Sequence, residues 1–181
     1  MNQFVFDLDI PIPLFKQGID PYSFPKVRHT KLNLDVLNLD MVNLFDRLNL
    51  SITLVEVFYS KPFLRSGIHI DSVGSDINKL NWIFSGEGCE MNWYSIKNQE
   101  STKEIKNTVI GTEYLLFEPN EVILEVSKVL SPLSLVHVGV PHNVINSYRH
   151  RWCVSVVYKA KDTNCRPSMQ QSLEIFKDFL K

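Results

Sequence analysis

Cysteine is scarce in this sequence, and its few cysteines form no recognisable pattern. The three of them (Cys89, Cys153 and Cys165) are widely separated, with no CxxC pair and no zinc-type spacing. This distribution argues against a disulfide framework and a structural zinc site, and it favours a reducing compartment. We therefore expect a cytoplasmic protein.

An excess of charge and a long apolar run are also absent. Lysine and arginine number 19 against 20 aspartates and glutamates, a formal net charge of −1, so nucleic acid is not favoured as a partner. No apolar run approaches the roughly 18 residues that a membrane-spanning helix needs. The N-terminus also lacks the basic and then apolar regions of a signal peptide, so we expect no association with a membrane.

The 181 residues that are present have an ordinary globular balance, with 44% apolar and 22% charged. This length suits one well-cored domain over 1–181. Four prolines within the first thirty residues predict extended segments and turns there. Leucine, methionine and phenylalanine then recur at three- and four-residue intervals, which predicts a supporting amphipathic helix over 34–49 with Asn33 as a candidate N-cap.

From Ser51 onward the pattern changes to short, β-branched and aromatic runs separated by turn residues. Many short strands after one helix predict a mainly β fold, a β-sandwich or barrel of jelly-roll type with its core at about 52–158. Apolar spacing near the C-terminus predicts a short closing helix over 168–180. The predicted strands are 52–59, 67–71, 80–84, 91–96, 108–117, 121–125, 134–138, 142–145 and 151–158.

The most informative segment is the predicted strand that contains His69 and Asp71. Alternate side chains of a strand share a face, so these two project together while Ile68 and Ile70 pack on the other side. A buried carboxylate is costly without a partner, and a divalent metal is one such partner. With a second histidine, the pair would form the two-histidine, one-carboxylate site of non-haem iron enzymes. The alternative is an ordinary Asp–His hydrogen bond without a metal.

A second cluster supplies the missing ligand and an unusual cation. His142 offers the second histidine, and His137 is a rival on a neighbouring strand. Arg151 opens the last predicted strand and shares a face with Cys153 and Ser155, whereas the other face is apolar. If that first face points into a barrel, the arginine must meet an anion, because it cannot lose its charge. The alternatives are an exposed Arg151 paired with a surface glutamate, and Arg149 as the anion-binding residue.

In this order and spacing the residues resemble the iron(II)- and 2-oxoglutarate-dependent oxygenases, in particular a subgroup of small members from viruses and bacteria. The HxD motif precedes His142 by some seventy residues, and Arg151 follows nine residues later. The resemblance covers about residues 52–158. Three further segments contribute to it: Val57-Phe58, Leu80-Asn81-Trp82 and Asn92-Trp93-Tyr94.

The resemblance implies a double-stranded β-helix (jelly roll) in which His69, Asp71 and His142 bind iron(II). It also implies that Arg151 and a nearby hydroxyl hold the distal carboxylate of 2-oxoglutarate. The family's usual serine position is Cys153 here, so the hydroxyl would come from Ser155, Tyr94 or Tyr59. Asn81, a buried amide in an apolar strand, would bind the C1 carboxylate of 2-oxoglutarate or a neighbouring backbone group.

The function implied is that of a dioxygenase that consumes molecular oxygen and 2-oxoglutarate and hydroxylates a small molecule or a peptide side chain. A virus-encoded member would work in the host cytoplasm. Two alternatives remain: a catalytically silent jelly-roll protein with a binding or structural role, and a cupin-like metal enzyme that does not use 2-oxoglutarate. The sequence specifies neither the substrate nor the oligomeric state.

Overall fold

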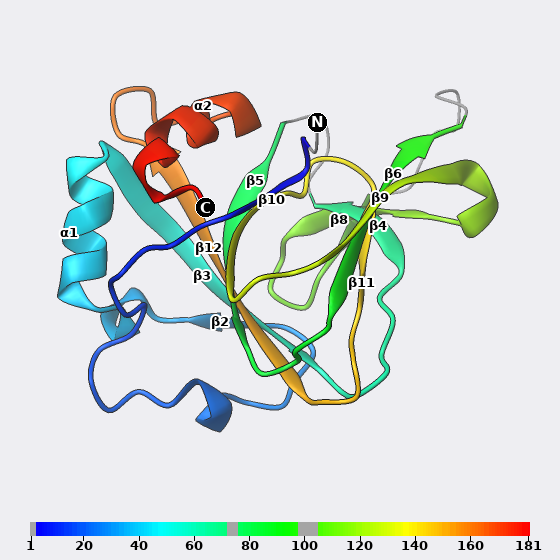
Figure 1. The fold of residues 1–181 in the computed structure, drawn as a ribbon, viewed down its shortest axis with the longest axis horizontal. Coiled ribbons are helices and arrows are strands. Elements are labelled where there is room, and N and C mark those ends of the chain that lie inside the picture. Colours follow the sequence, from blue (N-terminus) through cyan, green and yellow to red (C-terminus); the bar gives the residue numbers. More distant parts are fainter. Residues whose placement is uncertain (1–2, 72–75, 98–104) are drawn as a thin grey trace.

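The computed structural model describes residues 3–71, 76–97 and 105–181. Two antiparallel sheets of six strands form its body (Figure 1). In spatial order the first sheet contains β1 (Val5–Asp7), β10 (Leu133–His137), β5 (Asn78–Phe84), β12 (Arg151–Ala160), β3 (Leu50–Ser60) and β2 (Thr30–Leu32). The second contains β7 (Ile105–Asn107), β8 (Glu113–Phe117), β4 (Ile68–Asp71), β11 (His142–Ile145), β6 (Glu90–Ile96) and β9 (Val122–Val129).

The strands pair in a nested order along the chain. β3 pairs with β12, β4 with β11, β5 with β10 and β6 with β9, each pair antiparallel. Among these pairs, the two strands that lie farthest apart in the sequence, β3 and β12, pair in the first sheet, whereas the two that lie closest, β6 and β9, pair in the second. As a result, β4 and β11 lie side by side although some seventy residues separate them.

The predicted mainly β composition is confirmed, and most strand predictions agree with the observed strands within two or three residues. The prediction over 108–117 is wrong in its first half, where the chain turns before β8 begins at Glu113. Thr108 and Thr112 close that turn with a backbone and a side-chain hydrogen bond, and Gly111 has a φ of +82°. The prediction over 121–125 is too short, because β9 continues to Val129 along β6.

The supporting helix is shorter than predicted. The α-helix α1 (Leu39–Arg47) is capped by Asn38, whose side chain accepts a hydrogen bond from the backbone N–H of Asp40 at 2.8 Å. Asn33 makes no such bond. The apolar spacing begins before α1 because Val36 and Leu37 also pack in the core, although Leu34–Val36 forms only a 3₁₀ turn. The other 3₁₀ turns are Pro21–Ser23, Pro119–Glu121 and Lys177–Phe179.

The closing helix predicted over 168–180 is the helix α2 (Met169–Ile175) followed by a 3₁₀ turn. Its start is fixed by a capping box between Ser168 and Gln171. Phe176, at its end, is fully buried and packs edge-on against Phe45 of α1 and Tyr158 of β12. Both helices therefore cover the same face of the first sheet, the outer one (Figure 1).

A separate apolar cluster fills the space between the sheets. Val136 of the first sheet and Met91 and Trp93 of the second belong to it. The predicted apolar face of β12, with Trp152 and Val154, lies instead in the large cluster beneath the helices. The opposite face of β12 therefore points toward the second sheet, and we call this side of the first sheet its inner face.

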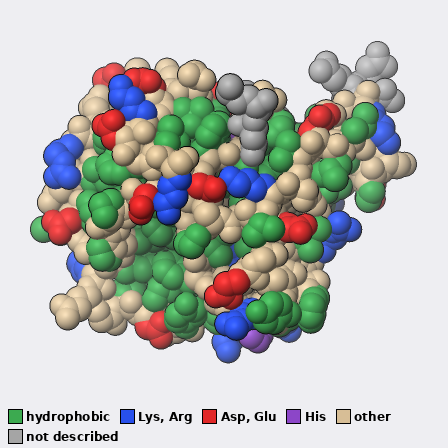
Figure 2. Space-filling model, viewed as in Figure 1, with side chains coloured by type: hydrophobic (Ala, Val, Ile, Leu, Met, Phe, Trp, Pro, Cys, Tyr) green, Lys and Arg blue, Asp and Glu red, His purple; other side chains and the backbone are tan. Residues whose placement is uncertain are grey.

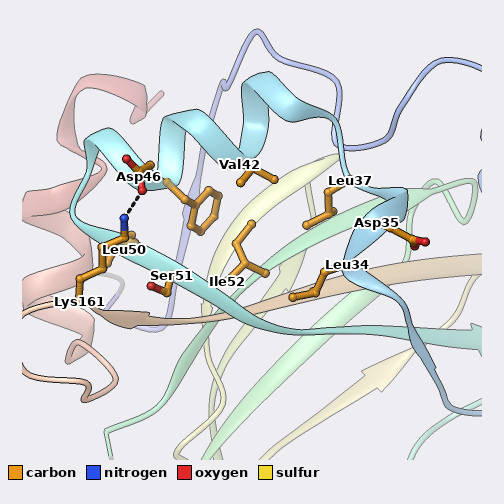
Figure 3. A pocket seen from close by; sticks show the side chains of 10 residues that line it. Leu34, Asp35, Leu37, Val42, Asp46, Leu50, Ser51, Ile52 and Lys161 are labelled. Carbon is orange, nitrogen blue, oxygen red and sulfur yellow. Dashed lines mark hydrogen bonds and ion pairs between the residues drawn. The ribbon is translucent and has the colours of Figure 1, made fainter.

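A cavity of about 490 Å³ lies beside α1 on the helix-covered side of the first sheet (Figure 3). Leu37 and Val42 line it together with Ile52 of β3, and the ion pair between Asp46 and Lys161 lies at one end. The first sheet separates this cavity from the space between the sheets, where the candidate ligands of the sequence analysis converge.

Neither α1 nor α2 has the length and apolar character of a membrane-spanning helix, and the rest of the described chain contains no such helix. On the face of the molecule in Figure 2, acidic and basic side chains are interspersed with apolar ones.

Candidate metal centre

The strand β4 presents His69 and Asp71 on the side that faces the first sheet. Ile68 and Ile70 alternate with them and pack in a small cluster on the other side of the second sheet, as the sequence pattern predicts. The side chains of His69 and Asp71 each remain 24% exposed. The pair is thus held by the sheet but is still accessible to a ligand from solvent.

His142 reaches this pair through the register of the sheet. The first residue of β11, it lies directly opposite His69, and the centroids of the two imidazole rings are 4.4 Å apart. Candidate ligand atoms of His69, Asp71 and His142 all lie within 4.8 Å of one another. Among the described residues, these three form the group of histidines, cysteines and carboxylates that is suited to one metal ion.

Hydrogen bonds to the backbone select the ring nitrogen that each histidine can offer. The Nδ1 atom of His69 lies 2.9 Å from the carbonyl oxygen of Gly67, and that of His142 lies 2.9 Å from the carbonyl oxygen of Val140. A carbonyl oxygen only accepts, so both Nδ1 atoms carry the proton. Both Nε2 atoms are then available as ligands, which is the tautomer that a metal-binding histidine needs.

The Nε2 atom of His69 lies 3.3 Å from Oδ1 of Asp71. If His69 is neutral, two acceptors face each other there, so either a proton or a metal cation must lie between them. In the metal-free site a proton is favoured: burial lowers the pKa of His69, but hydrogen bonding and attraction to Asp71 outweigh it and raise the pKa overall. A metal ion would displace that proton.

The other two candidate ligands are already in the forms that bind metals. Burial, and then repulsion from His69, lowers the pKa of His142 to about 3, so this imidazole is neutral. For Asp71, burial acts to raise the pKa, but the charge of Lys79 and the hydrogen bond with His69 outweigh it, and the pKa falls well below its usual value. Asp71 is therefore a carboxylate.

Lys79 is the principal residue of this site that the sequence analysis missed. Its Nζ atom donates to Oδ2 of Asp71 at 2.7 Å and to Oε2 of Glu56 at 2.9 Å. Attraction to these two carboxylates raises the pKa of Lys79 against the opposing effect of burial. The sequence did contain a sign of this role. Lys79 lies two residues before Asn81 in the apolar strand β5, so both side chains share one face of the strand.

Glu56 extends this network into the N-terminal segment. Its side chain is 1% exposed, and its Oε1 atom lies 3.2 Å from Nε2 of His29. The imidazole of His29 stacks on Phe58, with the ring centroids 4.3 Å apart. Burial acts to raise the pKa of Glu56, but His29 and Lys79 together lower it below its usual value, so this buried carboxylate is also ionised.

Arg151 lies on the inner face, as predicted, and is 3% exposed. Its Nε atom has no hydrogen-bond partner, and no carboxylate pairs with it in residues 3–71, 76–97 and 105–181. Its charge acts to lower the pKa of the Cys89 thiol, although burial prevails and raises that pKa. The backbone of Gly86 passes so close that a Cβ added there would lie 2.8 Å from Cβ of Arg151.

Ser155 and Asn81 also lie on the inner face, directly opposite each other on β12 and β5. The hydroxyl of Ser155 donates to Oδ1 of Asn81 at 2.5 Å. The structure therefore brings two of the predicted cosubstrate-binding residues together. It also gives the buried Asn81 side chain a partner from within the protein.

The two tyrosines considered as partners of Arg151 face elsewhere. Tyr59 pairs with Trp152 in the β3–β12 register, so it lies on the helix-covered face, and its hydroxyl lies 2.6 Å from Nδ1 of His150. Tyr94 packs with Ile68 on the outer side of the second sheet, and its hydroxyl donates to Asn143 at 3.2 Å. Neither hydroxyl is positioned for the role predicted for it, because strand alternation directs each away from the space between the sheets.

The rival residues are engaged away from the metal ligands. The Nε2 atom of His137 lies 3.0 Å from Oδ1 of Asp76, and burial lowers the pKa of this imidazole. Arg149 is more than half exposed and lies 3.6 Å from a carboxylate oxygen of Glu87.

No family model and no curated protein matches the sequence. Among solved structures, the X-ray structure of E. coli ycfD aligns with 70% of this chain at 17% sequence identity and a TM-score of 0.37. The alignment covers 29% of that protein, so this chain spans less than a third of its length. A likeness this slight supports no inference about fold or function.

Proposed function

We propose that this protein is an iron(II)- and 2-oxoglutarate-dependent dioxygenase that hydroxylates a small molecule or a peptide side chain. The observation that carries the proposal is the convergence of His69, Asp71 and His142 within 4.8 Å, with both histidines presenting Nε2. Two imidazoles and one carboxylate on one side of an ion leave the remaining positions open to other ligands, the arrangement of non-haem iron(II) oxygenases.

The order of the strands supports the fold that this family has. The nested pairing of β3–β6 with β9–β12 is that of a long antiparallel ribbon wound across two sheets. This order supports a jelly-roll fold, and it brings an early strand and a late one together at the ligands. β7 and β8 would then be additions between β6 and β9 at the edge of the second sheet.

Arg151 supports an anionic cosubstrate. A buried guanidinium cannot lose its charge, and Arg151 has no carboxylate partner among the described residues, so we assign the balancing negative charge to a ligand. The planar fork of arginine suits a carboxylate. In the proposed enzyme Arg151 would hold the distal carboxylate of 2-oxoglutarate, and the amide of Asn81, held by Ser155, would bind nearer the metal.

The residues of this chain would hold the reactants in place. Iron(II), when bound, would supply the redox chemistry that couples decarboxylation of 2-oxoglutarate to substrate hydroxylation. His69, Asp71 and His142 would fix the ion on one side. The apolar cluster between the sheets, which includes Met91 and Trp93, would exclude water from the cosubstrate.

One observation favours the alternative of a catalytically silent protein. Lys79 already balances the charge of Asp71, so the site is electrostatically satisfied without a metal ion. A silent protein would keep this ion pair and bind iron(II) no better than a variant without the histidines.

Anaerobic titration separates these possibilities. The wild-type protein is expected to bind iron(II) and then develop a visible charge-transfer absorption when 2-oxoglutarate is added. After air is admitted, succinate should form slowly from 2-oxoglutarate and molecular oxygen without added substrate. His142→Ala should lose metal binding, and Arg151→Ala should keep it but require more 2-oxoglutarate. Arg149→Ala, which removes an exposed arginine, is the matched control. Iron binding that is indifferent to His142 contradicts the proposal.

A further inference from the structure

Lys79 is a buried cation that contacts two carboxylates at once. Its side chain is 8% exposed and that of Glu56 is 1% exposed, so solvent does little to screen the pair. Because Asp71 and Glu56 bind the same ammonium at 2.7 and 2.9 Å, the two carboxylates lie close together. Glu56 is therefore a potential ligand beside the candidate metal centre, on the neighbouring sheet.

A second carboxylate would change what the centre can do. Carboxylate oxygens bind divalent metals readily, and a fourth protein ligand would occupy a position that a cosubstrate or oxygen needs. In the structure, both oxygens of Glu56 are engaged away from the three ligands. Oε2 accepts from Lys79, and Oε1 faces Nε2 of His29 at 3.2 Å.

The two oxygens of Asp71 also have separate partners. Oδ1 lies 3.3 Å from Nε2 of His69, on the side where the ligand atoms converge. Oδ2 accepts from Lys79 at 2.7 Å. An ammonium on one oxygen disfavours coordination of a metal by both oxygens, because the cation and the metal ion repel each other.

We propose that Lys79 is a positioning residue that limits the protein ligands of the metal to His69, Asp71 and His142. It holds Glu56 off the ion and leaves a single oxygen of Asp71 to bind it. The inference rests on the proposed metal site, and it adds the ion pairs of Lys79 as the reason that coordination positions stay open for other ligands. His29 contacts the other oxygen of Glu56 and helps to hold this side chain away from the ion, because the His29 ring is itself fixed by stacking on Phe58.

Manganese(II) bound to the full chain is the probe, since the relaxation of water protons reports how many waters remain on the ion. In Lys79→Met, Glu56 is released and should bind the ion. It would then displace one of the three waters on the ion, so the relaxation enhancement should fall by about a third. In Lys79→Met with Glu56→Gln, the enhancement should return. Lys128→Met is the matched control, because Lys128 forms an ion pair with Asp7 in another part of the protein.

An enhancement that is unchanged in Lys79→Met overturns the inference while leaving the metal site intact. One that stays low in the double variant overturns the part of the inference that concerns Glu56. Absence of manganese binding by the wild type contradicts the proposed function itself. If Lys79→Met does not fold, a crystal structure of the wild type with manganese(II) decides the question. The inference requires Glu56 on Lys79 and one oxygen of Asp71 on the ion; coordination by Glu56, or by both oxygens of Asp71, refutes it.

Discussion

His142 lies directly opposite His69 in the antiparallel pairing of β11 with β4. The metal centre depends on that register, because a slip of one residue would turn His142 to the other side of the sheet. Ser66, just before β4, fixes the same register. Its Oγ accepts from the backbone N–H of Val144, and its own N–H donates to the carbonyl oxygen of Val144.

Replacing Ser66 with alanine is therefore expected to weaken metal binding without touching a ligand. The variant loses the side-chain bond to Val144, at a cost of about 0.5–1.5 kcal/mol in the free energy of unfolding. Metal affinity, measured by calorimetry, should fall modestly. Ser127→Ala, on the exposed strand β9, is the control, and an equal loss of affinity there would contradict this explanation.

Gly86→Ala should damage the Arg151 site. The new Cβ would lie 2.8 Å from Cβ of Arg151 and would sit on a backbone with a φ of +81°. Strain from the backbone and the clash should together lower the free energy of unfolding by roughly 2–4 kcal/mol. Gly111→Ala has a φ of +82° but meets no atom within 4 Å, so it isolates the backbone cost. Urea denaturation of both variants measures the difference, and equal losses would rule out the steric explanation.

Ser155 and Asn81 are expected to be energetically coupled through their hydrogen bond. Ser155→Ala leaves the buried amide oxygen of Asn81 unpaired and should cost about 1–3 kcal/mol in the free energy of unfolding. In Asn81→Leu with Ser155→Ala, both partners are removed, so the double variant should be more stable than the sum of the single changes predicts. A double-mutant cycle by chemical denaturation tests this, and strict additivity would argue against it.

Variants of Tyr59 and Tyr94 test whether the cosubstrate binds between the two sheets. Both hydroxyls point away from the space between the sheets, so Tyr59→Phe and Tyr94→Phe should leave the Michaelis constant for 2-oxoglutarate unchanged. Arg151→Lys keeps the charge but loses the planar fork, and should raise that constant at least several-fold. Succinate formation over a range of 2-oxoglutarate concentrations measures all three. A raised constant in either tyrosine variant would mean that its hydroxyl reaches the cosubstrate.

The stability of the metal-free protein should decrease in acid partly through His142. Its pKa is depressed from 6.5 to about 3 in the folded chain, so the folded state binds fewer protons than the unfolded state. The stability it contributes is present above 6.5 and is lost as the pH falls toward 3. His142→Gln should therefore lose less stability than the wild type between about pH 7 and about pH 4.5. Urea denaturation at both pH values checks this, with His150→Gln as the control.

Local patterns in the sequence were sufficient for the strands and for the faces of their side chains. The alternation around His69 and Asp71 and that around Arg151 both hold in the structure, because burial of one side of a strand enforces a period of two. The same rule places Lys79 on the face of Asn81 within β5, whereas placing Tyr59 beside Trp152 required the pairing of β3 with β12.

The sequence by itself determined the mainly β composition and the candidate ligands. Only the tertiary structure decided which of them meet. The register of β11 brings His142 to His69, and packing of the two sheets brings Lys79 to Asp71. Helix boundaries also depended on it, since Asn38 rather than Asn33 caps α1. The physical reason is that contacts between strands distant in sequence are set by pairing and packing of the whole chain, and no local period encodes them.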